Sequence, residues 1–257
     1  MPELPEVETL CRQLREMILG QTLLKTLTLD EKLANFQELE NRPVISVTRR
    51  GKNLLLAFDD GRNLAVHLRM TGRLLWQEEE VPPKYTRFIM IFPRGRICFI
   101  DPRRFMTLTR ERTFPAQCGP EPLDGLDSSC LITIGQTRKV PIKSFLLDQA
   151  VIAGIGNIYA CEILHTAGIA PARPTHTLDS EEWQRILSAM DAILQKAITC
   201  RGTSISDWRD FYGRKGTFQN ELRVYRRDGL PCPRCGKTVV RFSLGGRGTY
   251  CCPTCQV

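Results

Sequence analysis

Four cysteines near the end of the chain have the spacing of a metal site. Two residues separate Cys232 from Cys235 and Cys252 from Cys255, and sixteen residues lie between the pairs. Two such pairs around a hairpin-length insert are typical of a four-cysteine zinc site. Four thiolates close the coordination shell, so the pattern predicts one structural Zn²⁺ that stabilises the fold and performs no chemistry. Cys251 is a rival ligand, but it would lengthen the second spacer to three residues, so Cys252 is preferred.

The insert between the two cysteine pairs carries arginines among glycines. Arg241 and Arg247 flank Gly245 and Gly246, and Gly248 follows. A guanidinium on a glycine-rich turn can approach a phosphate closely and donate two hydrogen bonds to it. The same pattern fits an exposed turn residue, and the insert alone does not decide between the two interpretations.

The N-terminus offers a different kind of chemistry. Removal of Met1 would expose the secondary amine of Pro2, which can attack a sugar carbon and form an iminium ion. The carboxylate of Glu3 beside it can exchange protons with that sugar. The local sequence alone, however, favours a plainer interpretation, in which Pro2 and Glu3 simply lead into a helix.

The charge is unevenly distributed along the 257 residues. The formal net charge is +8, and residues 201–257 hold nine Arg and two Lys against three Asp and one Glu, an excess of 11 − 4 = +7. Such a segment favours a phosphate-bearing partner, and a merely solvated basic surface is the alternative. The acidic N-terminus does not resemble a signal peptide, and no apolar run approaches the roughly 18 residues of a membrane span, so we expect a cytoplasmic protein.

Elements of two kinds must position these groups. Pro5 and an apolar stripe that ends before Gly20 predict a first helix, with Pro2 and Glu3 just ahead of it. Residues 22–112 read as short strands with tight turns and predict an antiparallel β-sandwich. The predicted strands are Val44–Thr48, Asn53–Phe58, Leu64–Leu68, Arg87–Phe92 and Arg96–Ile100.

The second half of the chain changes to a helical period. Residues 143–153 predict a helix that runs into a Gly-Ile-Gly-Asn turn at 154–157, and a second helix follows through Leu164. Asp179 caps a third helix. Residues 201–220 are polar and contain glycine, which predicts a mobile loop, and the tail predicts two short strands. We expect domains at 1–113, 130–222 and 223–257, with a linker at 114–129.

Motifs along the whole chain give these features a common context. They are PELPEVET at 2–9, RGK at 50–52, HLRMTG at 67–72, DPRRF at 101–105, GPEPL at 119–123, GIGNIYA at 154–160 and the four-cysteine tail. In this order they resemble the formamidopyrimidine-DNA glycosylase and endonuclease VIII family. The resemblance implies an α+β protein, with an N-terminal helix and β-sandwich, a helix–two-turns–helix domain and a β-hairpin zinc finger.

The resemblance also implies roles for individual residues. Pro2 would be the nucleophile, Glu3 the acid–base residue, and Lys52 a cation that participates in β-elimination. Arg247 would grip the phosphates beside the lesion and assist δ-elimination. The implied DNA contacts are Glu6, which positions the opened sugar, His67, Met70, Tyr85, Arg103, Phe105, Arg138, Lys143 and Asn157.

Base flipping leaves a hole in the duplex that the protein must fill. Met70, Arg103 and Phe105 match the family residues that do so. Core packing is the alternative for Met70 and Phe105, but both lie in Arg-rich loop sequence, which argues against burial.

Several positions depart from the family pattern. Arg69 and Thr71 stand where the family has Gly and Ser, and Met106 stands in place of Gly. Tyr85 and Arg87 occupy positions usually held by histidines. Ser206 replaces an Arg and Thr217 a Tyr in the loop that covers a flipped purine. These departures bear on base preference and not on the four proposed catalytic residues.

The implied activity is that of a bifunctional glycosylase and abasic-site lyase of base excision repair. It would excise oxidised purines such as 8-oxoguanine and formamidopyrimidines from double-stranded DNA bound in an interdomain cleft, through a Schiff base at Pro2. The expected state is a monomer at the bacterial nucleoid. Two alternatives are an endonuclease VIII-like enzyme for oxidised pyrimidines and a non-catalytic damaged-DNA-binding protein.

Overall fold

The computed structural model describes residues 1–110, 118–126, 128–205 and 207–257. The chain forms two compact units, and each contains two stretches of sequence. Unit 1 comprises Met1–Ala116 and Cys200–Gln219, and unit 2 comprises Gln117–Thr199 and Asn220–Val257.

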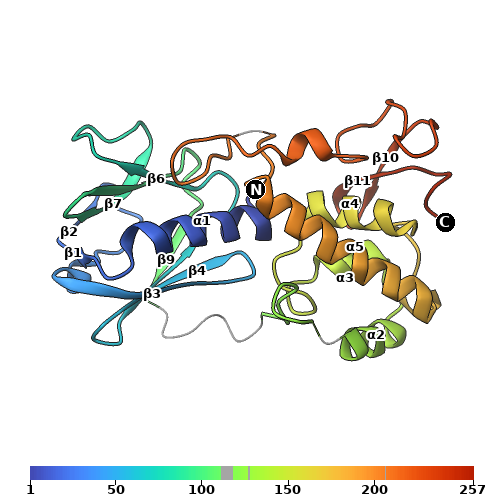
Figure 1. The fold of residues 1–257 in the computed structure, drawn as a ribbon, viewed down its shortest axis with the longest axis horizontal. Helices are drawn as coiled ribbons and strands as arrows, with labels where there is room; N and C mark the ends of the chain where they lie inside the picture. Colours follow the sequence, from blue (N-terminus) through green and yellow to red (C-terminus); the bar gives the residue numbers. More distant parts are fainter. Residues whose placement is uncertain (111–117, 127, 206) are drawn as a thin grey trace. The chain divides into compact units, whose positions relative to one another are not determined.

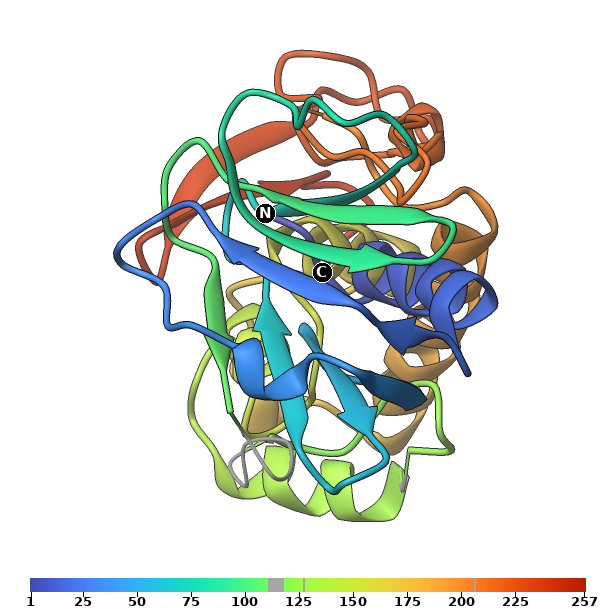
Figure 2. The same ribbon diagram turned by 90° about the vertical axis from the view of Figure 1, so that its left-hand side faces the viewer.

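Unit 1 contains two antiparallel sheets, as predicted. One sheet has the strand order β1-β3-β4-β5-β9 and the other β2-β7-β8-β6, and Figure 2 shows the strands in two layers. Glycines with positive φ close the tight turns, for example Gly61 between β4 and β5. The strands are β1 Thr22–Leu23, β2 Lys25–Thr28, β3 Arg42–Arg50, β4 Asn53–Phe58, β5 Asn63–His67, β6 Arg73–Gln77, β7 Thr86–Phe92, β8 Gly95–Ile100 and β9 Thr107–Thr109.

Helix α1, Leu4–Ile18, covers this core from one side (Figure 1). Its apolar stripe, including Leu10 and Leu14, is fully buried, and each such leucine contributes about 1.5–3 kcal/mol through removal from water. The helix begins one residue earlier than Pro5 suggests, so that proline occupies the second helical position. Gly20 follows the end of the helix with φ +77°, as expected of a C-terminal stop.

Residues 200–219 return to unit 1 after the helices of unit 2. In the described part they form no helix or strand before the 3-10 turn Phe218–Glu221. They are nevertheless not simply a polar loop, because Trp208 and Phe211 are buried in the sandwich core. The Phe211 carbonyl accepts the Trp76 backbone N–H at 2.8 Å. Residues 200–219 therefore pack with the first unit, whereas the sequence placed them in the 130–222 domain.

Unit 2 is helical and ends in a hairpin. It contains α2 Ser128–Thr137, α3 Ile142–Leu147, α4 Asn157–Ala167, α5 Ser180–Thr199, and the paired strands β10 Val240–Leu244 and β11 Arg247–Cys251. Asp179 accepts the backbone N–H of Glu182 at 2.8 Å and so caps α5, as predicted. The predicted helix 143–153 is wrong in its second half, because α3 ends at Leu147. There Gln149 donates from its side-chain amide to the carbonyls of Leu147 and Ile155, which holds two turns in place of a helix.

Among the described residues, no helix has the length and apolar character that crossing a membrane requires.

Candidate functional site

The proposed catalytic pair lies at the start of α1. Pro2 and Glu3 are both buried in extended chain just before the helix. Glu3 is the N-cap residue, and its backbone N–H donates to Glu6 Oε2 at 2.8 Å, while its carboxylate accepts the backbone N–H of Glu6. A negative charge at a helix N-terminus interacts favourably with the helix dipole. The local sequence thus holds a carboxylate directly beside the proline.

Glu6 is buried and bonded to two parts of the chain. It is only 1% exposed, and its second oxygen, Oε1, accepts the backbone N–H of Thr203 at 2.7 Å. Gly202 lies against the same carboxylate, since a Cβ there would come within 2.6 Å of Oε1. Glu6 therefore connects the first turn of α1 to the start of segment 200–219.

Lys52 and His67 lie close together in the same sheet. Lys52 is in the turn between β3 and β4, next to Asn53, which pairs directly with His67 on β5. Burial, together with the positive charges of Arg69 and Lys52, lowers the pKa of His67 to about 4. The imidazole is therefore neutral near pH 7.

A hydrogen bond fixes which nitrogen of His67 carries the proton. Its Nδ1 accepts the backbone N–H of Arg69 at 3.0 Å. The proton of the neutral ring must then sit on Nε2, which becomes a donor. A neutral donor beside Lys52 is suited to a phosphate oxygen. Arg69 holds this position with φ +57°, in the left-handed region that favours glycine.

Met70, Arg103 and Phe105, which we call the insertion cluster, lie together in two loops. The Arg103 guanidinium lies 4.7 Å from the centre of the Phe105 ring, and its Nη1 lies 3.5 Å from Met70 Sδ. Met70 is 48% and Phe105 46% exposed, so neither belongs to the core, as the sequence predicts. Two apolar side chains and one cation are thus presented to solvent as a group. Tyr85 is also exposed, and its φ of +68° places it in the left-handed region.

In unit 2 the helices hold the cysteine hairpin. Asn157 at the start of α4 donates from Nδ2 to the Gly248 carbonyl at 3.0 Å. Lys143 Nζ donates to Thr249 Oγ1 at 2.7 Å and to the Gly248 carbonyl at 3.3 Å. Lys143 is 1% exposed, so in this structure it supports the hairpin and is not displayed on the surface. The neighbouring Arg247 is exposed at the start of β11.

Arg138 is partly exposed and already has a partner. Its Nη1 forms an ion pair with Asp148 at 3.0 Å, and its guanidinium lies 5.9 Å from the centre of the Phe145 ring. An incoming phosphate would have to compete with Asp148 for this guanidinium.

The four predicted zinc ligands meet at one point. The sulfur atoms of Cys232, Cys235, Cys252 and Cys255 all lie within 4.8 Å of one another. Two of the separations are 3.9 Å, between Cys232 and Cys255, and 3.4 Å, between Cys235 and Cys252. Tetrahedral Zn–S bonds of about 2.3 Å place sulfur atoms about 3.8 Å apart, so the donor set fits one Zn²⁺.

Sequence reasoning missed several residues that support these groups. One of them is His165, whose Nε2 lies 3.3 Å from Cys232 Sγ. No periodic pattern in the sequence indicates that this histidine lies beside the zinc ligands. Thr71 and Asp101 bond to each other at 2.5 Å, and Thr203 bonds to Glu6. The position of Asp101 within the DPRRF motif was the only sequence signal for its importance. Ser206 lies outside the described residues.

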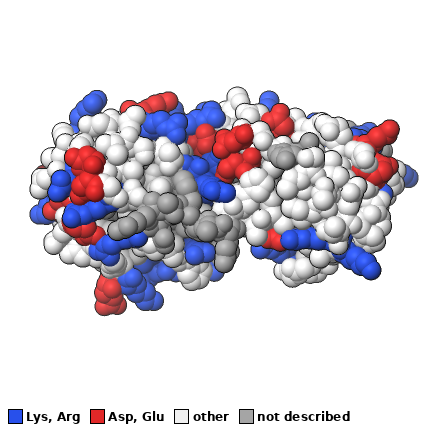
Figure 3. All heavy atoms as spheres, turned by 90° about the horizontal axis from the view of Figure 1, so that it is seen from below, with Lys and Arg blue, Asp and Glu red and all other residues white. Residues whose placement is uncertain are grey.

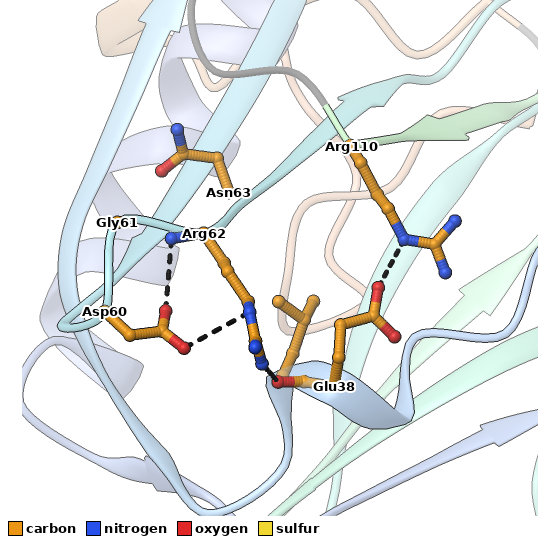
Figure 4. A pocket seen from close by; sticks show the side chains of 7 residues that line it. Glu38, Asp60, Gly61, Arg62, Asn63 and Arg110 are labelled. Atoms are coloured by element: carbon orange, nitrogen blue, oxygen red, sulfur yellow. Dashed lines mark hydrogen bonds and ion pairs between the residues drawn. The ribbon is translucent and has the colours of Figure 1, made fainter.

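One pocket of unit 1 contains none of the candidate site residues in its lining. It has a volume of about 720 Å³ and is lined by Glu38, Asp60, Arg62 and Arg110, among others (Figure 4). Its charges are paired within it: Arg62 with Asp60 at 3.3 Å, and Arg110 with Glu38. On the face drawn in Figure 3, basic and acidic side chains are likewise interspersed. The charged groups that line this pocket therefore compensate one another.

Three family descriptions match the chain in sequence. The formamidopyrimidine-DNA glycosylase N-terminal domain matches residues 1–108, and the H2TH domain of the same enzymes matches residues 118–208. The zinc finger found in FPG and IleRS matches residues 229–257.

Relatives that match along their full length are formamidopyrimidine-DNA glycosylases. The formamidopyrimidine-DNA glycosylase of Desulfitobacterium hafniense is 40% identical over 273 residues, which is 100% of both chains. That of Thermus thermophilus is 41% identical over 267 residues, covering 100% of this chain and 98% of the relative.

Solved structures match over the same extent. The MutM (Fpg) protein of Thermus thermophilus has a TM-score of 0.90 at 40% identity, covering 99% of this chain and 98% of that one. Lactococcus lactis Fpg in complex with abasic-site DNA has a TM-score of 0.92 at 33% identity, covering 99% of each chain. On sequence, fold and zinc ligands together, the chain belongs to the formamidopyrimidine-DNA glycosylase family.

Proposed function

We propose that this protein is a bifunctional DNA glycosylase and abasic-site lyase of base excision repair. It removes oxidised purines, 8-oxoguanine and formamidopyrimidines, from double-stranded DNA. The observation that carries the proposal is the Pro2–Glu3 pair, held in front of α1 by the capping box with Glu6. It acts as a monomer on chromosomal DNA in the bacterial cytoplasm.

The residues at the N-terminus account for the chemistry. After removal of Met1, the lone pair of the Pro2 nitrogen attacks the sugar C1′, and the damaged base leaves with the electrons of the glycosidic bond and takes up the proton that the nitrogen releases. Glu3 donates the proton that opens the sugar ring at its oxygen, which produces an iminium ion. The ionised Glu3 then assists removal of a C2′ proton. The 3′ phosphate leaves by β-elimination and the 5′ phosphate by δ-elimination, and hydrolysis of the iminium frees Pro2.

Residues from both units account for DNA binding. Lys52 and the neutral His67 in unit 1 supply a cation and a donor for the phosphates beside the lesion. Arg247 supplies a second phosphate contact from unit 2, and Asn157 holds its strand through the hydrogen bond to the Gly248 carbonyl. The insertion cluster fills the space that the flipped nucleotide vacates. Zinc maintains the hairpin that carries Arg247 and takes no part in the reaction.

Relatives support the substrate class. Lactococcus lactis Fpg has been solved with abasic-site DNA, and two of its mutants with DNA that contains Fapy-dG. Fapy-dG is an oxidised purine, and an abasic site is what remains after such a base is excised, so both belong to the substrate class proposed.

Borohydride trapping tests the proposal directly. Protein without Met1 is mixed with duplexes that contain 8-oxoguanine, an oxidised pyrimidine or an abasic site, and borohydride then reduces any iminium to a stable adduct. We expect adducts with 8-oxoguanine and abasic duplexes. The matched control carries Gly-Ser ahead of Pro2 and should form none. Adducts mainly with the oxidised pyrimidine would overturn the substrate assignment, and binding without any adduct would leave a damage-sensing protein.

A further inference from the structure

The insertion cluster is built from two loops that each cross from one sheet to the other. Residues 68–72 join β5 in the first sheet to β6 in the second, and carry Met70. Residues 101–106 join β8 in the second sheet to β9 in the first, and carry Arg103 and Phe105. Nothing in the chain order forces the two loops to move together.

One buried carboxylate binds both loops. Asp101 is 1% exposed, and its Oδ2 accepts the backbone N–H groups of Phe105 and Met106, each at 2.6 Å. Its Oδ1 accepts the backbone N–H of Arg103 at 3.2 Å and the Thr71 hydroxyl at 2.5 Å. Three bonds therefore shape the 101–106 loop, and the fourth attaches the 68–72 loop to it.

Buried charge fixes the position of this carboxylate. Arg87, 4% exposed, places Nη1 3.6 Å from Asp101 Oδ2 and Nε 2.5 Å from Asp30 Oδ2. Asp30 also accepts from Arg104 Nε at 2.8 Å, which attaches the outer side of the 101–106 loop. Arg87 thus places a permanent cation behind Asp101.

An apolar contact joins the loops as well. A Cβ at Gly72 would come within 2.4 Å of the Leu68 carbonyl oxygen and 2.8 Å of Met106 Cε. Met106 is 3% exposed and packs closely on the backbone of Gly72. Arg87 and Met106 thus both contact the junction between the two loops.

We propose that Asp101 and Thr71 are positioning residues that make the two loops one insertion unit, so that Met70, Arg103 and Phe105 enter the duplex together. The proposal rests on the proposed function, since it assigns these residues a part in base flipping. A preorganised cluster avoids the entropy cost of ordering two loops separately while the base pair opens. The Thr71 hydroxyl is the group that attaches the 68–72 loop to Asp101, and Thr71 belongs to neither the insertion cluster nor the proposed catalytic residues.

Two substitutions at Thr71 isolate that hydroxyl. Thr71→Val keeps the shape and removes the bond to Asp101, whereas Thr71→Ser keeps the bond. A duplex with 2-aminopurine beside 8-oxoguanine reports insertion through the change in fluorescence on unstacking. Base excision from the duplex and cleavage of an abasic site in a single strand, which has no partner base to replace, are measured with the same proteins.

We expect Thr71→Val to slow the fluorescence change and duplex excision by about tenfold, as a small misplacement of binding groups does. Single-strand cleavage should be unchanged, and Thr71→Ser should behave as the wild type. The thermal midpoint of Thr71→Val should fall only slightly, because the buried Asp101 carboxylate loses one of its four donors and keeps three. The inference would be overturned if the wild type is active and Thr71→Val inserts at the same rate. It would also be overturned if Thr71→Val loses single-strand cleavage as strongly as it loses duplex excision. Absence of excision by the wild type would instead overturn the proposed function.

Discussion

Glu6 and Thr203 are 197 positions apart in the sequence, yet the carboxylate of Glu6 accepts the Thr203 backbone N–H at 2.7 Å. The other oxygen of the same carboxylate accepts the Glu3 backbone N–H. One buried side chain therefore holds both the residue beside the proposed nucleophile and the first part of segment 200–219. The order of the proposed active site depends on this connection.

Substitution of Glu6 by Ala should strongly destabilise unit 1. It leaves two buried N–H groups without their acceptors, which costs about 2–4 kcal/mol in the free energy of unfolding. Urea denaturation measures that loss, and hydrogen exchange at Thr203 should accelerate. Glu16→Ala on the exposed side of the same helix is the control. Equal stability of the two variants would contradict the role assigned to Glu6.

Arg69 occupies a backbone conformation better suited to glycine. Its φ is +57°, so Arg69→Gly should remove backbone strain. Glycine also raises the conformational entropy of the unfolded chain, which opposes this gain, so we expect the free energy of unfolding to rise by up to about 1 kcal/mol. Arg69→Lys keeps both the charge and the strain and should not gain stability. Thermal unfolding of the three proteins provides the comparison, and a lower midpoint for Arg69→Gly would speak against strain at this position.

Cysteine substitutions should separate the zinc ligands from their neighbour. Cys252→Ser removes one of four converging sulfurs, so we expect loss of bound zinc and of DNA affinity, because the hairpin carries Arg247. Cys251→Ser should retain one zinc per chain, since Cys251 lies outside the four-sulfur cluster. Metal analysis of purified protein measures both. A zinc-free Cys251→Ser protein would reverse the ligand assignment.

His67 should make stability depend on pH in the acid range. Its pKa falls from 6.5 to about 4 on folding, so between these values the unfolded chain binds more protons. Its contribution is fully present above pH 6.5 and is lost as the pH falls towards 4. His67→Asn should therefore lose less stability than the wild type between pH 7.5 and pH 5, measured by urea denaturation. Imidazole ¹⁵N shifts should show a protonated Nε2 at neutral pH, and parallel pH curves for the two proteins would count against a buried neutral imidazole.

Local patterns in the sequence predicted local structure well. The strand Asn53–Phe58, the cap at Asp179 and the four cysteine ligands depend on near neighbours and are as expected. What the sequence did not predict depends on distant partners. The helix at Lys143 ends early because the Gln149 side chain binds two loop carbonyls, and Lys143 itself is buried by a hairpin residue more than a hundred positions away. No periodicity could indicate that Thr71 would meet Asp101.

The two-part construction of unit 1 also sets the order in which the protein becomes competent during synthesis. The proposed nucleophile is made first, but Thr203, Trp208 and Phe211, which complete the surroundings of α1 and the sandwich, emerge from the ribosome only after all the helices α2–α5. A nascent chain that stops at Thr199 would lack the side chains that pack around Trp76 and the Thr203 N–H that Glu6 binds. An enzyme that cuts DNA strands is thereby assembled only when most of its length exists, so incomplete translation products carry the amine without its support.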